Sequence, residues 1–323
     1  MNVALKAENE PRDHGGGLDA AMARYGGQRA DWLDLSTGIN PRPYPLHDIS
    51  ADAWNRLPDD TATDALLLAA RRFWNVPDSA QIIAAPGASS LIARIPDLTF
   101  ATSAYIPGPT YNEHAAAFAA RKRLVSADDA EMPVHVYVHP NNPDGRLWPD
   151  VPKSDTELTI IDESFCDTCP EQSRIDQTAK PGTIVLKSFG KFWGLAGLRL
   201  GFAIGQRRTI GRLDDLLGPW PVAGPALEIG ARALGDDDWA DATRIRLARD
   251  AARLDARLDT LGASLVGGTD LFRTYAMPGR AADWQAKLAR AHVWTRVFPY
   301  SETWMRIGLP GSDADWAQLE AAL

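Results

Sequence analysis

The stretch LKSFGKFWGLAGLRLG, residues 186–201, places Lys191 between two apolar runs that predict neighbouring buried strands. A lysine held between core strands is desolvated, and desolvation favours its neutral amine. The neutral amine is the nucleophile that forms a Schiff base with a carbonyl compound. Ser188 and Arg199 flank Lys191, and a hydroxyl and a guanidinium on either side of an amine are suited to holding a phosphate. An S-x-x-K spacing on its own is more typical of a basic loop between strands.

The longer string, S-F-G-K followed by G-L-R-L-G, is far more specific. It resembles the lysine segment of the class I/II aminotransferases, the fold-type I enzymes that use pyridoxal 5'-phosphate (PLP). The resemblance implies that Lys191 is the catalytic Schiff-base lysine and that Ser188 and Arg199 bind the cofactor. Three other strings, P-G-A-S-S, N-N-P-D-G and D-E-S-F, fall in the family's order, so the resemblance covers almost the whole chain.

The string P-G-A-S-S joins a predicted strand to a predicted helix. Free N–H groups and the helix dipole at such a turn favour an anion, although a serine that caps the helix gives the same pattern. In the resembled family this turn holds the PLP phosphate, which implies that role for Gly87, Ala88 and Ser89. Tyr111 follows a P-G-P-T loop and is either a core aromatic or, as the resemblance implies, the ring that stacks on the PLP pyridine.

Two further predicted strands end in polar strings. H-P-N-N-P-D-G is rich in turn-forming residues, and its resemblance to N-P-N-N-P-T-G implies that Asn142 donates to the phenolic oxygen of PLP. Asp162 begins D-E-S-F at the carboxyl end of a predicted strand, where open α/β sheets bind ligands. An aspartate there can keep the pyridine nitrogen protonated and make the ring an electron sink, whereas a helix cap or a salt bridge is the structural alternative.

The first 45 residues predict an N-terminal arm. H-G-G at His14 and the later L-D-L-S-T-G-I-N-P resemble the start of the threonine-phosphate decarboxylases of cobalamin biosynthesis, in which the arm folds over the active site. His14 and Thr37 are therefore candidate substrate-binding residues, and a solvated tail is the alternative. R-L-P replaces the family's R-Y-P, so Leu57 cannot supply the tyrosine hydroxyl that reaches the cofactor phosphate of the other subunit.

Two arginines near the C-terminus are candidate substrate ligands. Arg306 lies in the apolar run W-M-R-I-G, and a buried arginine needs an anionic partner. The family has L-R-I at this place, which implies that Arg306 binds the substrate α-carboxylate as a bidentate fork. Arg296 resembles a second family arginine near the substrate. By position alone, each is more typical of an ordinary surface arginine.

The resemblance implies an α/β fold of the aspartate-aminotransferase type, with a mostly parallel large-domain sheet and a small α+β domain. We expect an arm at 1–45, a large PLP-binding domain at 46–218 and a small C-terminal domain at 219–323. A long amphipathic helix predicted near residues 236–261 joins the two domains. The family forms homodimers with active sites at the subunit interface, and we expect the same here.

Composition limits the other possibilities. The net charge of −8 argues against nucleic acid or an anionic membrane as the main partner. No apolar run approaches the ~18 residues of a membrane span, and residues 1–14 lack the apolar core of a signal peptide, so we expect a cytoplasmic protein. Cys166 and Cys169 form a C-x-x-C pair without further ligands nearby, which favours incidental, reduced thiols and no metal site.

We therefore expect PLP-dependent decarboxylation of L-threonine O-3-phosphate, a small phosphorylated amino acid, to (R)-1-amino-2-propanol O-2-phosphate. The alternative is histidinol-phosphate aminotransferase, which shares every cofactor motif. The H-G-G arm and Phe165, where those aminotransferases usually have tyrosine, favour the decarboxylase. A non-catalytic regulatory module of the same fold is a third hypothesis, which the lack of a basic helix-turn-helix segment disfavours. Serine phosphate and threonine phosphate are not distinguished by the sequence.

Overall fold

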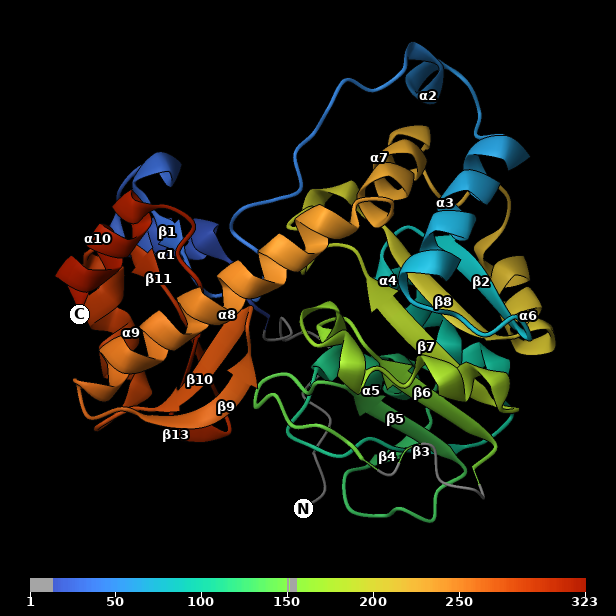
Figure 1. Cartoon of the computed structure of the whole chain (residues 1–323). Helices are drawn as coiled ribbons and strands as arrows, with labels where there is room; N and C mark the ends of the chain where they lie inside the picture. Colours follow the sequence, from blue (N-terminus) through green and yellow to red (C-terminus); the bar gives the residue numbers. More distant parts are fainter. Residues whose placement is uncertain (1–13, 150, 152–155) are drawn as a thin grey trace.

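A seven-stranded sheet forms the centre of the computed structural model, which describes residues 14–149, 151 and 156–323 (Figure 1). The strands run in the order β2 (Ala80–Ala85), β8 (Gly201–Gln206), β7 (Thr183–Ser188), β6 (Leu158–Asp162), β5 (Val134–Val138), β3 (Ser103–Tyr105) and β4 (Leu124–Ser126). The pairs from β7 to β4 are parallel, and β8 runs antiparallel to both of its neighbours. The prediction of a mostly parallel sheet is therefore confirmed.

Helices cover both faces of this sheet because its central strands are apolar on both sides. Val185 faces one layer, whereas Ile184 and Leu186 face the other, and all three are fully buried. The first layer contains α3 (Asp60–Phe73), α7 (Gly224–Leu234) and the start of α8 (Asp237–Asp259). The second contains α4 (Ala88–Arg94), α5 (Asn112–Ala120) and α6 (Arg207–Leu217).

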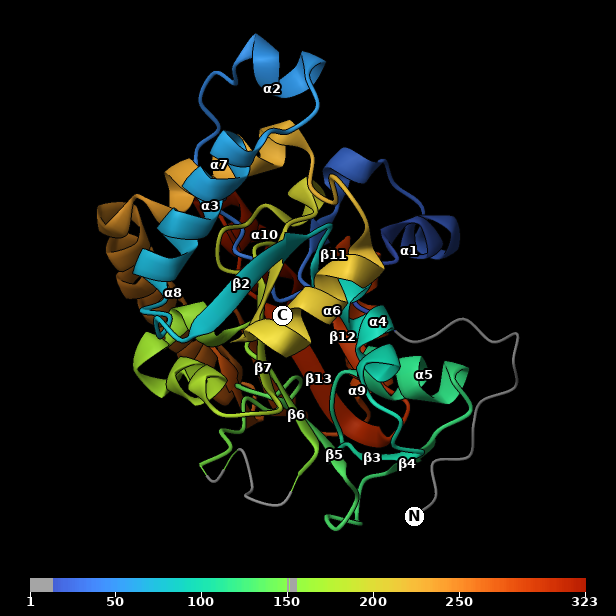
Figure 2. The same cartoon turned by 90° about the vertical axis from the view of Figure 1, so that its right-hand side faces the viewer.

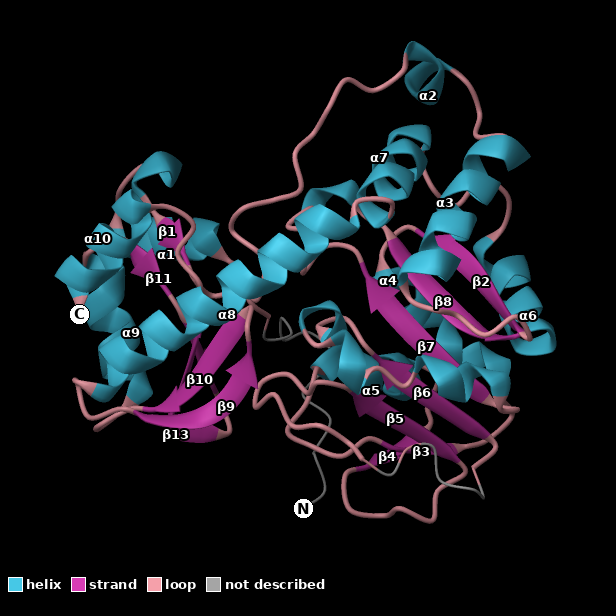
Figure 3. Ribbon diagram, in the orientation of Figure 1, coloured by secondary structure: helices cyan, strands magenta, loops and turns pink. Residues whose placement is uncertain are grey.

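A second, four-stranded antiparallel sheet lies at the other end of α8, the long helix that connects the two parts (Figures 1 and 3). Its order is β12 (Arg296–Phe298), β13 (Ser301–Gly308), β10 (Phe272–Ala276) and β9 (Ser264–Thr269). The helices α9 (Ala281–Arg290) and α10 (Asp313–Ala322) pack with it. This arrangement is the small α+β unit that the sequence predicts.

The described part of the N-terminal arm packs on the small sheet's side of the molecule. The arm contains one helix, α1 (Leu18–Tyr25), and its strand β1 (Leu33–Asp34) pairs in parallel with β11 (Val293–Trp294). The chain then runs without regular structure to α2 (Ala51–Asn55), which lies at the top of both views and packs on α7 (Figures 1 and 2). The expectations for residues 1–13 lie outside the described residues, and the predicted domain boundaries remain predictions.

The strands β4 and β9 are among those that the sequence did not predict. β4 has only three residues, and β9 contains the pair Gly267-Gly268, which interrupts any apolar alternation. The glycines permit a close approach, because a Cβ on Gly267 would lie 2.1 Å from the carbonyl oxygen of Asp144. No helix within the described residues is long and apolar enough to cross a membrane.

Candidate active site

Lys191 lies just after β7, in a segment fixed by the arm. The backbone N–H of Asn40 donates to the Lys191 carbonyl at 2.9 Å, and the Asn40 side chain donates to the Phe192 carbonyl at 2.8 Å. Burial and the nearby Arg306 guanidinium lower the pKa of Lys191 to about 8, with Arg199 adding to the effect and Asp162 opposing it. A substantial fraction of the amine is therefore neutral near pH 8, as a nucleophile requires.

Asp162, at the end of β6, is buried and anionic. His114 of α5 contacts its Oδ2 through Nε2 at 2.8 Å, and Ser164 donates to Oδ1 from its backbone N–H and its hydroxyl. Burial acts to raise the pKa of Asp162, but these hydrogen bonds outweigh it and hold the pKa below its ordinary value. The sequence analysis missed His114, although its position one helical turn after Tyr111 was a usable signal.

The P-G-A-S-S turn and Arg199 form a cradle for an anion. Gly87 has a φ of 82°, and a Cβ there would lie 2.5 Å from the Arg199 guanidinium. Gly201, which pairs with Ser188 at the edge of the sheet, would place a Cβ 2.4 Å from the Ala88 nitrogen. The two glycines thus let the turn, Ser188 and Arg199 converge at the start of α4, where backbone N–H groups are free of side-chain caps.

Arg306 joins the two sheets. Its guanidinium donates to Asn142 Oδ1 at 2.5 Å and to the Ser36 carbonyl at 2.6 Å, and only 4% of the residue is exposed. The face of Phe272 lies 5.1 Å from the guanidinium carbon. The structure therefore brings Asn142, Arg306 and the arm together beside Lys191.

The start of the described arm reaches from Arg306 to Tyr111. A Cβ on Gly15 would lie 3.1 Å from Arg306 Nη2. His14 Nε2 lies 2.9 Å from Glu113 Oε1, and its ring centroid is 6.2 Å from that of Tyr111. His14 and Tyr111 are thus neighbours at one side of the site.

The remaining predicted residues lie on elements that surround this group. Arg296 is the cross-strand partner of Arg306, so both side chains leave the same face of the small sheet. The Thr37 carbonyl lies against Gly308, and Ser89 is exposed on the first turn of α4. Leu57, which follows α2, is 67% exposed and does not belong to this group.

Neither cysteine takes part in the site. Cys166 is buried and Cys169 half-buried, and both are free thiols. Within the described ranges, no cluster of three or more histidine, cysteine or acidic side chains is arranged to hold a metal ion.

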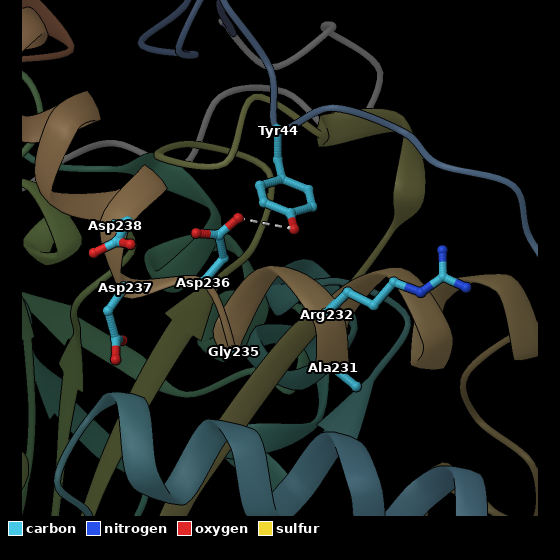
Figure 4. A pocket seen from close by; sticks show the side chains of 7 residues that line it. All are labelled: Tyr44, Ala231, Arg232, Gly235, Asp236, Asp237 and Asp238. Atoms are coloured by element: carbon cyan, nitrogen blue, oxygen red, sulfur yellow. Dashed lines mark hydrogen bonds between the residues drawn. The ribbon is translucent and has the colours of Figure 1, made fainter.

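A separate hollow of about 510 Å³ lies where α8 begins (Figure 4). It is lined by Tyr44, Ala231, Arg232, Gly235, Asp236, Asp237 and Asp238. Asp236 caps α8 and lies 3.3 Å from the Tyr44 hydroxyl, so its carboxylate already has structural partners. None of the residues grouped around Lys191 lines this hollow.

Comparison with known proteins identifies the class first. The family model for aminotransferase class I and II matches residues 126–323, more than half of the chain. The chain therefore belongs to this family. Histidinol-phosphate aminotransferase from Sinorhizobium meliloti, solved with pyridoxal-5'-phosphate, superposes with a TM-score of 0.81 over 98% of this chain and 95% of its own at 20% identity. L-threonine-O-3-phosphate decarboxylase from Porphyromonas gingivalis gives 0.72 over 89% and 97%, also at 20% identity. These likenesses confirm the predicted fold.

Two curated relatives then define the branch. A threonine-phosphate decarboxylase from Sinorhizobium sp is 41% identical over 97% of this chain and 98% of its own length. The protein of the same name from Pseudomonas aeruginosa is 37% identical over 96% and 97%. Within its family, the chain thus groups with the threonine-phosphate decarboxylases, as the arm and the D-E-S-F string predicted.

The lowered pKa of Lys191 predicts a pH-dependent stability in the cofactor-free protein. Below pH 8 both the folded and the unfolded state carry this proton, and the buried charge costs the folded state about 3 kcal/mol. As the pH rises from 8 towards 10.5, the folded state loses the proton first and the cost disappears. Wild type should therefore gain stability relative to Lys191→Met over this range, measured by denaturant unfolding of both proteins. A difference that stays constant with pH would contradict the assignment.

Proposed function

We propose that this protein is a PLP-dependent decarboxylase that converts L-threonine O-3-phosphate to CO2 and (R)-1-amino-2-propanol O-2-phosphate for cobalamin biosynthesis. The observation that carries the proposal is the near-full-length identity to two threonine-phosphate decarboxylases. The geometry supports it, because an amine of lowered pKa, a buried carboxylate and two guanidinium groups lie together. We also propose that the protein acts in the cytoplasm.

The chain's residues fit PLP. Lys191 would hold its aldehyde carbon, Asp162 its ring nitrogen and Asn142 its phenolic oxygen, with Tyr111 against the ring. The cradle residues Gly87, Ala88, Ser89, Ser188 and Arg199 would hold its phosphate. The close approach of the Arg199 guanidinium to Gly87, which a Cβ would block, supports this fit, as does the anionic state of Asp162. When bound, PLP supplies a protonated ring that accepts the electron pair released at the substrate α-carbon.

The chain's own groups would decide which bond to that carbon breaks. Arg306 would bind the α-carboxylate and set it perpendicular to the ring plane, so that the carbon–carboxylate bond breaks and CO2 leaves. A proton then replaces the carboxylate at the α-carbon. The Lys191 amine, with a pKa of about 8, is suited to carrying that proton near neutral pH. The substrate phosphate would bind Arg296, with His14 and Thr37 of the arm nearby.

The second candidate is histidinol-phosphate aminotransferase. A relative named histidinol-phosphate aminotransferase 2, from Rhizobium meliloti, is 34% identical but over only 51% of this chain. Phe165 bears no hydroxyl and packs edge-on against Phe272 at 5.0 Å, which leaves the phenolic-oxygen contact to Asn142. Both observations favour the decarboxylase.

We also propose that the protein is a homodimer. Large apolar side chains on and around α2 are exposed: Leu46 is 62% exposed, and Trp54, Leu57 and Leu68 are each 67% exposed. The helix packs on α7 at the edge of the molecule, and its exposed apolar side chains are suited to packing on a second copy of the chain (Figure 2).

Incubation of the PLP-loaded protein with L-threonine phosphate should release CO2 and form the phosphorylated amino alcohol without any keto acid. Lys191→Ala should lower the rate at least ~1000-fold, because it removes the nucleophile. Isotope-labelled CO2 and product amine are measured together. Amino transfer from glutamate to imidazole-acetol phosphate, with no CO2 release, would instead establish the second candidate.

Gly87→Ala should weaken binding of PLP to the cofactor-free protein at least ~10-fold. The added Cβ collides with the Arg199 guanidinium, and the residue has a φ of 82° that alanine tolerates poorly. Gly211→Ala in α6 is the matched control, since its Cβ would meet nothing within 4 Å. Equilibrium titration with PLP measures both. Equal PLP affinity of the two variants would contradict the assignment of the Gly87 turn to the phosphate site.

Trp54→Glu combined with Leu57→Glu should convert the dimer to monomers at micromolar concentration, because a buried interface does not accept unpaired carboxylates. Phe100→Glu serves as control, because Phe100 is 94% exposed and lies far from α2 along the chain. Sedimentation velocity measures the mass of each. A wild type that is monomeric at all concentrations would overturn the dimer proposal.

A further inference from the structure

A buried ion pair lies beneath the candidate active site and has no part in the chemistry described above. Lys187 Nζ is 2.6 Å from Glu163 Oε2, and the two side chains are 2% and 0% exposed. Asp167 lies 3.6 Å from the same ammonium. The Trp74 indole donates to Asp167 at 2.9 Å, and its ring lies 5.5 Å from the Lys187 ammonium. The cluster thus holds one cation and two carboxylates in the core.

The pair connects the ends of two adjacent strands. Glu163 directly follows Asp162 of β6, and Lys187 directly precedes Ser188 of β7. Side chains alternate across a sheet, so the pair lies on the face opposite to Asp162 and Ser188. The backbone N–H of Glu163 donates to the Leu186 carbonyl at 2.9 Å, which places the ion pair where the ladder between the two strands ends.

Glu163 has polar partners besides Lys187. Glu163 also accepts hydrogen bonds from the Ser173 hydroxyl at 2.7 Å and the Arg174 backbone N–H at 2.5 Å. Burial alone would lower the pKa of Lys187, but Glu163 and Asp167 outweigh it and raise that pKa, so the ammonium stays charged. Apolar residues of similar volume commonly support a core as well as a buried ion pair does. The fold alone therefore does not account for charges at this place.

We propose that Lys187 and Glu163 are positioning residues, whose ion pair fixes the carboxyl ends of β6 and β7 relative to each other and so sets the spacing of Asp162 and Ser188 for PLP. The inference rests on the assignment of the cofactor site in the proposed function. A directional contact of 2.6 Å between rigid strand ends limits their relative movement more than apolar packing does. Binding constellations tolerate errors of only about 0.5 Å in their supporting groups.

The test uses full-length cofactor-free protein and PLP as the probe. Lys187→Met/Glu163→Met removes one positive and one negative charge together. The net charge of the cluster is therefore unchanged, because Asp167 keeps its negative charge. Glu163→Asp keeps the charge but shortens its reach by one methylene. Lys187→Arg is the conservative variant. Arg273→Met is the control, because the Arg273–Asp255 pair has the same 2.6 Å contact but lies on α8 and β10.

We expect the double variant and Glu163→Asp to bind PLP at least 10-fold more weakly and to shift the pH midpoint of the bound cofactor's visible absorbance. Lys187→Arg should retain affinity within about 3-fold, and Arg273→Met should leave both readouts unchanged even where it lowers the melting temperature. If the double variant fails to fold, Glu163→Asp and Lys187→Arg decide the question. PLP affinity and pH midpoint that stay at wild-type values in the folded variants would overturn the proposal.

Neither readout requires turnover. An absence of CO2 release from threonine phosphate by the wild type would contradict the proposed reaction, while the PLP titrations would still test the ion pair. Conversely, normal decarboxylation by a Glu163→Asp variant with unchanged PLP affinity would overturn the ion-pair proposal alone.

Discussion

The contact between the N-N-P-D-G loop and the small sheet is the constraint on which the site depends. Arg306 of β13 donates to Asn142, and Thr274 of β10 donates to the Pro143 carbonyl at 2.6 Å. The glycines of β9 let its backbone lie directly on the loop beyond that point. The two sheets, which share one buried apolar cluster, are thereby also joined by hydrogen bonds at the edge where Lys191 emerges. Without these contacts, Arg306 would have no fixed position relative to the strand ends of the large sheet.

The arm completes this arrangement by covering the lysine segment. Its Asn40 and Tyr44 N–H groups donate to the Lys191 and Trp193 carbonyls, each at 2.9 Å, so two backbone hydrogen bonds hold the arm on this segment. Ser36 meanwhile accepts from Arg306. The same stretch of arm thus fixes the lysine on one side and the arginine on the other. Their proximity, together with burial, lowers the pKa of the amine.

Local patterns predicted most of the fold and the central group of the site, because both are encoded in contiguous residues. Apolar runs located the core strands, and the short strings located Lys191, Asp162 and Asn142 at their ends. What the sequence left out are pairings between distant segments, such as His114 with Asp162, which are separated by 48 residues. Lys187 was overlooked for a related reason. In an apolar strand it resembles an ordinary basic residue until the fold places Glu163 beside it.

The two lysines of one short segment show how the fold divides charge between structure and chemistry. Burial acts to lower the pKa of both lysines. At Lys187 the carboxylates of Glu163 and Asp167 outweigh burial and keep the amine protonated. At Lys191 the guanidinium groups of Arg306 and Arg199 add to burial and outweigh Asp162, so the pKa stays lowered. The electrostatic environment thus changes from mostly negative around Lys187 to mostly positive around Lys191. A surplus of cations around Lys191 in a chain of net charge −8 also favours entry of an anionic ligand. In the proposed reaction Arg199 is taken by the cofactor phosphate, so the substrate carboxylate and the substrate phosphate would each pair with one of the two cross-strand arginines of the small sheet, Arg306 and Arg296.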